Sequence, residues 1–203
     1  MRKLTIGVVD YVVGNHASVR HCLHRLGLGC RVSDDPAVLE SCDLLVLPGV
    51  GAFRLAMQAL HERSLDRFIL REVERRKPIL GICLGMQLLC EASHEHGYTT
   101  GLALIPGEAV QLAPRRWHIG WNVVEQVRKD ALFEHGSGQA FYFNHSYAYQ
   151  GPEEFQVWKS RLDQPIAALV RRDRIVGMQF HPEKSQEAGR VLLQRVIGGL
   201  CNA

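Results

Sequence analysis

The fold of this chain is decided by the stretch Pro78-Ile79-Leu80-Gly81-Ile82-Cys83-Leu84-Gly85-Met86-Gln87-Leu88-Leu89. The apolar run 79–82 predicts a buried strand, and the helix-favouring residues from Leu84 onward predict a helix directly after it. Only a very tight turn fits between the two, and Cys83 occupies it with a glycine two residues away on each side. This is the pattern of a nucleophile elbow, with cysteine in place of serine.

The surroundings of Cys83 favour a reactive thiol. A strained turn excludes side chains next to the nucleophile, which explains Gly81 and Gly85. The N–H groups at the start of the helix point at the sulfur and favour the thiolate. The alternative is that Cys83 is a small core residue, since free cysteines are often buried.

Length and composition indicate one ordinary globular domain over residues 1–203, with 46% hydrophobic and 22% charged residues. The formal net charge of +3 is too small to indicate a nucleic-acid partner, and no run predicts a signal peptide or a membrane span. The six cysteines form no CxxC pair, so we expect reduced thiols and a cytoplasmic location. The histidine and cysteine clusters lack paired ligand spacing, so we expect no metal and no cofactor.

The first half of the chain alternates strands and helices, which predicts an α/β fold with an open, mostly parallel sheet. We expect strands at 4–9, 30–33, 44–47 and 79–82, and helices around 19–26, 55–60 and 65–76. Sites in such sheets lie beyond the carboxyl ends of the strands. Cys83 and the glycine-rich turn 48–52 should therefore share one edge of the sheet.

After residue 91 the pattern changes to short strand-like runs, which predict an antiparallel extension at one side of the sheet. We expect these runs at 102–105, 109–112, 122–127 and 140–143, and two further strands at 166–170 and 175–179. Residues 171–174 should form a hairpin between the last two, and a final helix should follow with apolar residues at 191–200.

A cysteine nucleophile needs a base, and His181 is the candidate because it directly follows the strand 175–179. Glu183 lies two residues on, beyond a stiff proline, where it could fix the imidazole tautomer. The alternative is an ordinary surface histidine, one of ten in the chain.

Backbone N–H groups for an oxyanion could come from the turn Gly49-Val50-Gly51 and from Leu84 at the elbow. The alternative for the turn is a plain strand-to-helix connection. A phosphate loop is excluded, because no Gly-Lys-Ser/Thr follows.

Together, the residues around Cys83 and His181 closely resemble class I (triad-type) glutamine amidotransferases over essentially the whole chain. Within that class the sequence looks like the HisH glutaminase subunits of imidazole glycerol phosphate synthase. The narrower resemblance rests on short motifs along the chain: Asp10-Tyr11, Gly14-Asn15, Pro48-Gly-Val-Gly-Ala-Phe53, Gly101-Leu102, Ile105-Pro-Gly107, His118-Ile-Gly-Trp-Asn122, His145-Ser-Tyr147 and Phe180-His-Pro-Glu-Lys-Ser185.

This resemblance implies hydrolysis of L-glutamine to glutamate and ammonia by Cys83, His181 and Glu183. It also implies that Gln87 and the segment His145-Ser146-Tyr147 hold the glutamine beside the 49–51 turn. The ammonia would pass to a (β/α)8-barrel cyclase subunit of the HisF type in a heterodimer, for synthesis of imidazole glycerol phosphate and AICAR in histidine biosynthesis.

By the same resemblance, Asn15, Trp121 and Lys184 would lie near the interface with the cyclase. Their alternative roles are a helix-capping asparagine, a packed tryptophan and a solvated lysine. The family further implies an idle isolated subunit, whose oxyanion donor near Val50 is misplaced until the partner's ligand binds.

The chain departs from the family's usual pattern at Val12-Val13, Trp117 and Asn144. These departures fall near segments used for partner contact or site shaping, so a second hypothesis is a HisH-like paralogue that supplies ammonia to an acetamidino-sugar synthase for surface polysaccharide. A stand-alone γ-glutamyl hydrolase or cysteine peptidase, and a non-catalytic binding module, are further alternatives.

Overall fold

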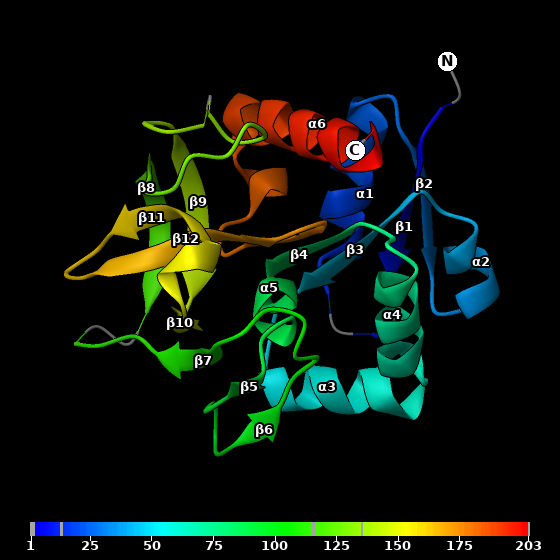
Figure 1. Cartoon of the computed structure of the whole chain (residues 1–203), viewed down its shortest axis with the longest axis horizontal. Helices are drawn as coiled ribbons and strands as arrows, with labels where there is room; N and C mark the ends of the chain where they lie inside the picture. The colour runs from blue at the N-terminus through cyan, green and yellow to red at the C-terminus, as the bar shows by residue number, and fades with distance from the viewer. Residues whose placement is uncertain (1–2, 13, 115–116, 135, 203) are drawn as a thin grey trace.

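The computed structural model describes residues 3–12, 14–114, 117–134 and 136–202. Its centre is a nine-stranded sheet in the order β2-β1-β3-β4-β13-β12-β11-β8-β9 (Figure 1). The first five of these strands are parallel. Their bounds are Gly29–Ser33 (β2), Thr5–Val9 (β1), Leu44–Gly49 (β3), Ile79–Cys83 (β4) and Ile175–Met178 (β13).

The remaining four strands continue the sheet as an antiparallel extension. They are Pro165–Arg172 (β12), Gln156–Arg161 (β11), His118–Gln126 (β8) and Ala140–His145 (β9). A small second sheet is formed by Tyr147–Gln150 (β10), Glu108–Gln111 (β7), Ala92–Ser93 (β5) and Thr99–Thr100 (β6). The predicted α/β fold with an antiparallel addition is confirmed.

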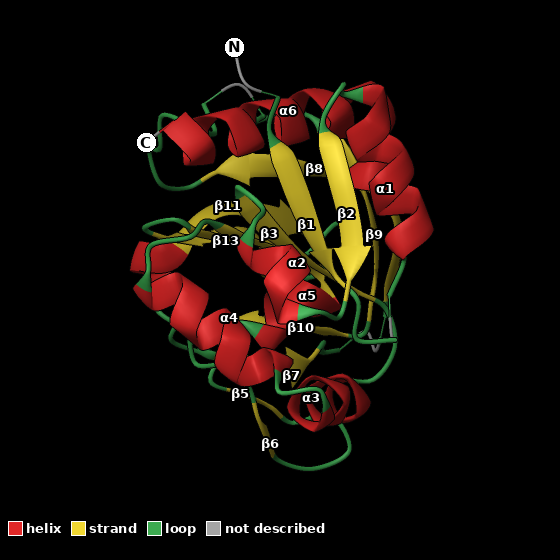
Figure 2. Ribbon diagram, turned by 90° about the vertical axis from the view of Figure 1, so that its right-hand side faces the viewer, coloured by secondary structure: helices red, strands yellow, loops and turns green. Residues whose placement is uncertain are grey.

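Helices cover both faces of the parallel strands (Figure 2). One face packs against His16–Arg25 (α1) and Gln186–Asn202 (α6). The other packs against Pro36–Glu40 (α2), Phe53–Glu62 (α3), Leu65–Glu74 (α4) and Leu84–Leu88 (α5). The strands alternate between two cores: Leu44 and Val46 face the first helix layer, whereas Leu45 and Leu47 face the second. This is why β3 reads as an unbroken apolar run.

One predicted element needs correction, and one strand was missed. The apolar run 102–105 is no strand: its backbone N–H groups donate to carbonyls at the end of α5, as in Leu102 to Leu88 at 2.9 Å and Leu104 to Leu89 at 2.9 Å. It is apolar because it covers that helix end. The strand β11 was not predicted, because Gln, Lys and Ser interrupt its apolar residues. Four of its six residues are nevertheless buried, and a fifth is partly buried.

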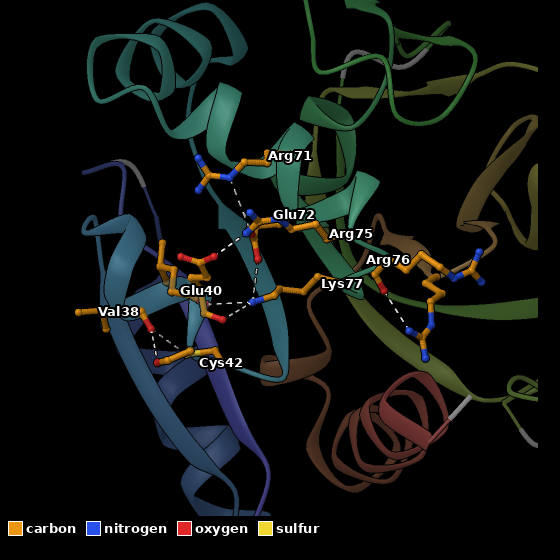
Figure 3. A network of polar contacts seen from close by, with 11 residues as sticks. Val38, Glu40, Cys42, Arg71, Glu72, Arg75, Arg76 and Lys77 are labelled. Atoms are coloured by element: carbon orange, nitrogen blue, oxygen red, sulfur yellow. Dashed lines mark hydrogen bonds and ion pairs between the residues drawn. The ribbon is translucent and has the colours of Figure 1, made fainter.

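A network of charged side chains joins the end of α4 to the end of α2, just before the chain enters β4 (Figure 3). The carboxylate of Glu72 is 1% exposed and lies 2.9 Å from Nζ of Lys77 and 3.1 Å from Arg75. Lys77 also donates to the carbonyl of Glu40 at 2.6 Å. A buried carboxylate needs such partners, so this network fixes the chain as it enters β4.

Within the part of the chain that the structure describes, none of the helices combines the length and apolar character needed to cross a lipid bilayer.

Candidate active site

Cys83 ends β4 and caps α5, so the strand-to-helix turn is as tight as predicted. Its backbone has φ 54° and ψ −108°, a conformation that side chains disfavour. Both flanking glycines are required by close approach. A Cβ at Gly85 would lie 1.7 Å from the carbonyl oxygen of Leu47, and one at Gly81 would lie 2.6 Å from that of Gly85. The turn therefore presses against β3 and presents the thiol beyond the strand.

The glycine-rich turn lies beside Cys83 because Gly49 and Cys83 are register partners on β3 and β4. Gly49 is closely packed, because a Cβ there would lie 2.6 Å from the hydroxyl of Tyr11 and 2.8 Å from the Cβ of Leu84. The Tyr11 hydroxyl donates to the carbonyl of Pro48, which anchors the start of the turn. Val50, by contrast, is exposed.

His181 and Glu183 come together with Cys83 at the carboxyl end of β13. Nδ1 of His181 lies 2.8 Å from Oε1 of Glu183, and both side chains are 1% exposed. The short 3-10 turn Pro182–Lys184 (η2) brings the carboxylate back to the ring. Because Nδ1 donates to the carboxylate, Nε2 is left to interact with the sulfur, and it has no hydrogen-bond partner among the described residues.

The charge on His181 is set by its burial and by two neighbouring groups, Cys83 and Glu183. Burial lowers the pKa of His181, but interactions with the Cys83 sulfur and the Glu183 carboxylate outweigh it and raise the pKa to about 9. The protonated ring between a sulfur and a carboxylate is therefore favoured at neutral pH. This arrangement suits a cysteine nucleophile that works as a thiolate.

Asn15 has a role that the sequence did not predict. It stands at the N-cap position of α1 but makes no capping hydrogen bond. Instead its side-chain amide donates to Oε1 of Glu183 at 3.2 Å, the same oxygen that His181 contacts. Asn15 thus contacts the candidate triad through Glu183.

A cavity of about 220 Å³ opens beside Cys83. Its walls are the turn after β3, the elbow and the β9–β10 connection, so segments that are distant in the sequence meet there. The lining residues are Val50, Gly51, Cys83, Leu84, Gln87, Glu95, Asn144, His145, Ser146 and Tyr147. The sequence-predicted substrate residues Gln87, His145, Ser146 and Tyr147 are all among them, whereas Gly49 is not.

Glu95 is a cavity residue that the sequence analysis missed. Its carboxylate accepts a hydrogen bond from the backbone N–H of Phe53 at 2.6 Å, which ties it to the start of α3. In the sequence it stands between His94 and His96, which lack paired metal-ligand spacing, and nothing in this segment indicates a wall of the site. No sequence signal linked Glu95 to Cys83.

Two buried histidines support the far wall. Nδ1 of His145 lies 2.9 Å from the carbonyl of Tyr147, so that nitrogen carries the hydrogen. Its Nε2 lies 3.1 Å from Nδ1 of His118 and accepts from it. Burial lowers the pKa of His145 to about 3, and the neighbouring His118 and His181 act in the same direction. His145 is therefore neutral near pH 7, and its two hydrogen bonds hold the Tyr147 backbone and the His118 ring in place.

The other predicted interface residues, Trp121 on β8 and Lys184 on η2, both approach the ring of Tyr142 on β9. Trp121 is exposed and meets Tyr142 edge-on, with ring centroids 6.2 Å apart. The exposed Lys184 holds its Nζ 6.0 Å from the centre of the same Tyr142 ring. Trp121 is therefore not the packed core residue of the alternative role, and Lys184 is not a lysine surrounded by water alone.

One of the departures from the family pattern, Asn144, lies in the cavity wall. Val12 is exposed with φ 74°, and Trp117 is exposed next to β8. Asn144 lines the cavity, and its carbonyl lies 3.6 Å from the Cys83 sulfur. Val13 lies outside the described residues.

Among the residues that the structure describes, no three or more His, Cys, Asp or Glu side chains are grouped as a metal site.

Comparison with known proteins places this geometry in a family. The sequence model of the family described as glutamine amidotransferase class-I matches residues 7–197. The chain is 42% identical over 192 residues to the imidazole glycerol phosphate synthase subunit HisH of Streptococcus gordonii, with 93% of each chain covered. It is also 42% identical over 201 residues to the HisH subunit of Syntrophotalea carbinolica, covering 93% of this chain and 97% of that one.

Solved structures show the same fold at low identity. A glutamine amidotransferase crystal structure superposes with a TM-score of 0.79 at 19% identity, covering 98% of this chain and all of the other. The structure of PurLQS from Thermotoga maritima gives a TM-score of 0.77 at 20% identity, with the same coverage. The chain therefore belongs to the class I glutamine amidotransferases, and within them to the HisH family of imidazole glycerol phosphate synthase subunits.

Proposed function

We propose that residues 1–203 act as one glutaminase domain that hydrolyses L-glutamine for an imidazole glycerol phosphate synthase in histidine biosynthesis. The observation that carries the proposal is the cavity beside Cys83, together with the buried His181–Glu183 pair whose histidine interacts with the same sulfur. Family membership at about 42% identity to HisH subunits supports the same reaction and pathway. The six free cysteines fit a reducing cytoplasm.

In this mechanism Cys83 is the nucleophile and His181 the proton carrier. The thiolate attacks the carboxamide carbon of glutamine, and the protonated ring gives its proton to the departing ammonia. The neutral ring then takes a proton from water, which cleaves the γ-glutamyl thioester and releases glutamate. Glu183 keeps Nδ1 protonated throughout, so Nε2 always faces the reacting atoms.

The tetrahedral oxyanion needs backbone donors, which we assign to the 49–51 turn and to Leu84. The turn is held at both ends, by the Tyr11 hydroxyl at Pro48 and by Glu95 at the N–H of Phe53. Between these anchors Val50 and Gly51 are exposed. A rotation of the peptide planes at this tip would bring a donor to the oxyanion without moving the strand or the helix.

The lining of the cavity suits an amino acid. The Glu95 carboxylate can pair with the α-ammonium group of glutamine, while Gln87, Ser146 and Tyr147 offer polar contacts along the remainder. Nε2 of Gln87 already donates to the carbonyl of Tyr147 at 2.7 Å, so its amide has one orientation before the substrate arrives. His145 lies in the same wall and orients Tyr147.

We further propose that the partner is a (β/α)8-barrel cyclase of the HisF type, which receives the ammonia in a heterodimer. The surface that supports this is the β8 stripe, defined as Trp117, Ile119, Trp121 and Val123. These alternate positions are 62%, 63%, 50% and 46% exposed, which is unusual for a run of large apolar residues. Lys184 and Tyr142 continue the stripe toward His181.

The test is glutamate release from glutamine, measured for the chain alone, with the cyclase subunit, and with the cyclase plus its nucleotide ligand. We expect little activity alone and strong stimulation by the liganded partner. Cys83→Ala should abolish release, whereas Cys201→Ala, a cysteine of α6, should not.

Other outcomes would redirect the proposal. Activity that ignores this cyclase would keep the chemistry and favour the acetamidino-sugar paralogue. High turnover by the lone chain, unchanged by any partner, would contradict the idle subunit and favour a γ-glutamyl hydrolase. Full activity in Cys83→Ala would overturn the mechanism.

A further inference from the structure

Gln179 is a fully buried amide that touches both the nucleophile and a wall of the cavity. It follows β13 directly and lies two residues before His181, and its own backbone N–H donates to Ala168 at 2.9 Å. Its side-chain Oε1 accepts from Nε2 of Gln87 at 3.3 Å. Its Nε2 lies 3.9 Å from the sulfur of Cys83. Burying an amide is unfavourable unless both ends are satisfied, and these two contacts satisfy it.

The direction of this chain of contacts is fixed. A primary amide has two N–H donors, and Gln87 uses them for the carbonyl of Tyr147 and for Oε1 of Gln179. Because Oε1 of Gln179 accepts there, its NH₂ group must face Cys83. On the other side, Oε1 of Gln87 has no hydrogen bond within the described part of the chain, although Gln87 lines the cavity.

An N–H donor beside sulfur favours one ionisation state. In the thiol form, Cys83 can donate to the carbonyl of Asn144 at 3.6 Å and gains little from Gln179. In the thiolate form, the sulfur becomes an acceptor, and the amide N–H of Gln179 stabilises it. Among the described titratable groups, the Cys83 sulfur raises the pKa of His181 after β13 and of Tyr11 after β1, and Glu95 and His145 line the same cavity. Gln179 itself does not titrate.

We propose that Gln179 is a positioning residue for the glutaminase reaction: its amide holds the Cys83 sulfur as a thiolate and fixes the Gln87 amide that lines the cavity. The inference rests on the proposed function for the second half of this role. The first half, the role of Gln179 toward the Cys83 sulfur, does not depend on the proposed function and is tested separately.

The experiment is the rate of Cys83 alkylation by iodoacetamide as a function of pH, read on the Cys83 peptide by mass spectrometry. The variants are Gln179→Met, which keeps an unbranched chain of similar size without a donor, and Gln179→Glu. We expect the midpoint of the pH profile to rise by about one unit in Gln179→Met, a roughly tenfold loss of thiolate, and by more in Gln179→Glu because of charge repulsion. The Michaelis constant for glutamine, measured with the liganded partner, should rise several-fold in both.

The matched control is Gln156→Met. Gln156 is also buried, but its amide donates to the carbonyl of Gly151 at 2.9 Å, away from Cys83. This variant should leave the alkylation midpoint where it is in the wild type.

Unchanged midpoints in folded Gln179→Met and Gln179→Glu would overturn the proposal. So would the failure of both to fold, which would assign the amide to stability. A raised midpoint with an unchanged Michaelis constant would retain the role toward sulfur and overturn the role toward Gln87. Alkylation needs no turnover, so a wild-type protein that lacks glutaminase activity but shows the raised midpoint in the variants would refute the proposed function and not this role.

Discussion

Nδ1 of His181 lies 2.8 Å from Oε1 of Glu183 in a contact from which solvent is excluded, since both side chains are 1% exposed. This pairing decides which ring nitrogen faces Cys83. Together with the Cys83 sulfur, it explains why a histidine whose pKa burial lowers has that pKa raised to about 9.

Glu183→Gln removes the charge of this contact and keeps its size. We expect kcat for glutamine hydrolysis with the liganded partner to fall by about 10²- to 10⁴-fold, because the protonated ring loses its counter-charge and its tautomer is no longer fixed. The Michaelis constant should change little. Glu187→Gln, an exposed glutamate paired with Arg190, is the control and should retain full kcat. A kcat for Glu183→Gln within twofold of wild type would contradict the assigned role.

The β8 stripe predicts where the partner docks. Ile119→Asp places a charge in the middle of the exposed apolar run and should raise the dissociation constant for the cyclase by at least about tenfold, or ~1.4 kcal/mol. Leu55→Asp on α3 is the control, because Leu55 is 60% exposed but lies outside the stripe. Calorimetric titration would measure both. Equal affinities for the two variants would move the interface elsewhere.

The Glu72 network predicts a stability effect without an effect on the chemistry. Glu72→Gln leaves Lys77, whose side chain is 12% exposed, without its carboxylate. We expect a loss of about 2–3 kcal/mol in the free energy of unfolding, below the value for a wholly buried pair because Arg75 can turn to water. Urea unfolding measures it, and Glu74→Gln on the exposed side of α4 should cost under 0.5 kcal/mol. Glutaminase activity per folded molecule should be unchanged in both.

His145 predicts a weakness toward acid. Its pKa in the folded chain is about 3, against an ordinary value of 6.5, so the unfolded chain takes up a proton there before the folded chain does. The stability tied to its neutral form is complete above pH 6.5 and is lost as the pH falls toward 3. His145→Gln should therefore lose less unfolding free energy than the wild type between pH 7 and pH 4, whereas the exposed His24→Gln should match the wild type. Parallel pH profiles for wild type and His145→Gln would rule this out.

The parallel half of the fold was predictable because its signals are local. Strands such as β3 and β4 are buried on both faces and read as apolar runs, and the glycines at 81 and 85 are dictated by backbone contacts next to Cys83. The run 102–105 shows the limit of this logic. Apolar character reports burial, and a loop that covers a helix end is as buried as a strand.

The candidate site was predictable where chain topology sets the geometry and not where packing does. Cys83 ends β4 and His181 follows β13, and because these parallel strands are direct neighbours in the sheet, both residues lie at the same carboxyl end. Glu95 and Gln179 reach the site through the packing of a loop and the direction of one amide, which no periodicity encodes. Asn15 is similar: its sequence position indicates a helix cap, and only the structure shows its amide at Glu183.

The backbone of Cys83, with its positive φ, carries a consequence for protein engineering. Conformations of this kind are unfavourable by about 1–3 kcal/mol for any residue with a Cβ, and glycine is relieved of most of that penalty. A selection for heat resistance alone would therefore drive position 83 toward glycine and yield a sturdier but inert protein. Libraries built on this scaffold should be screened for turnover and thermal tolerance together.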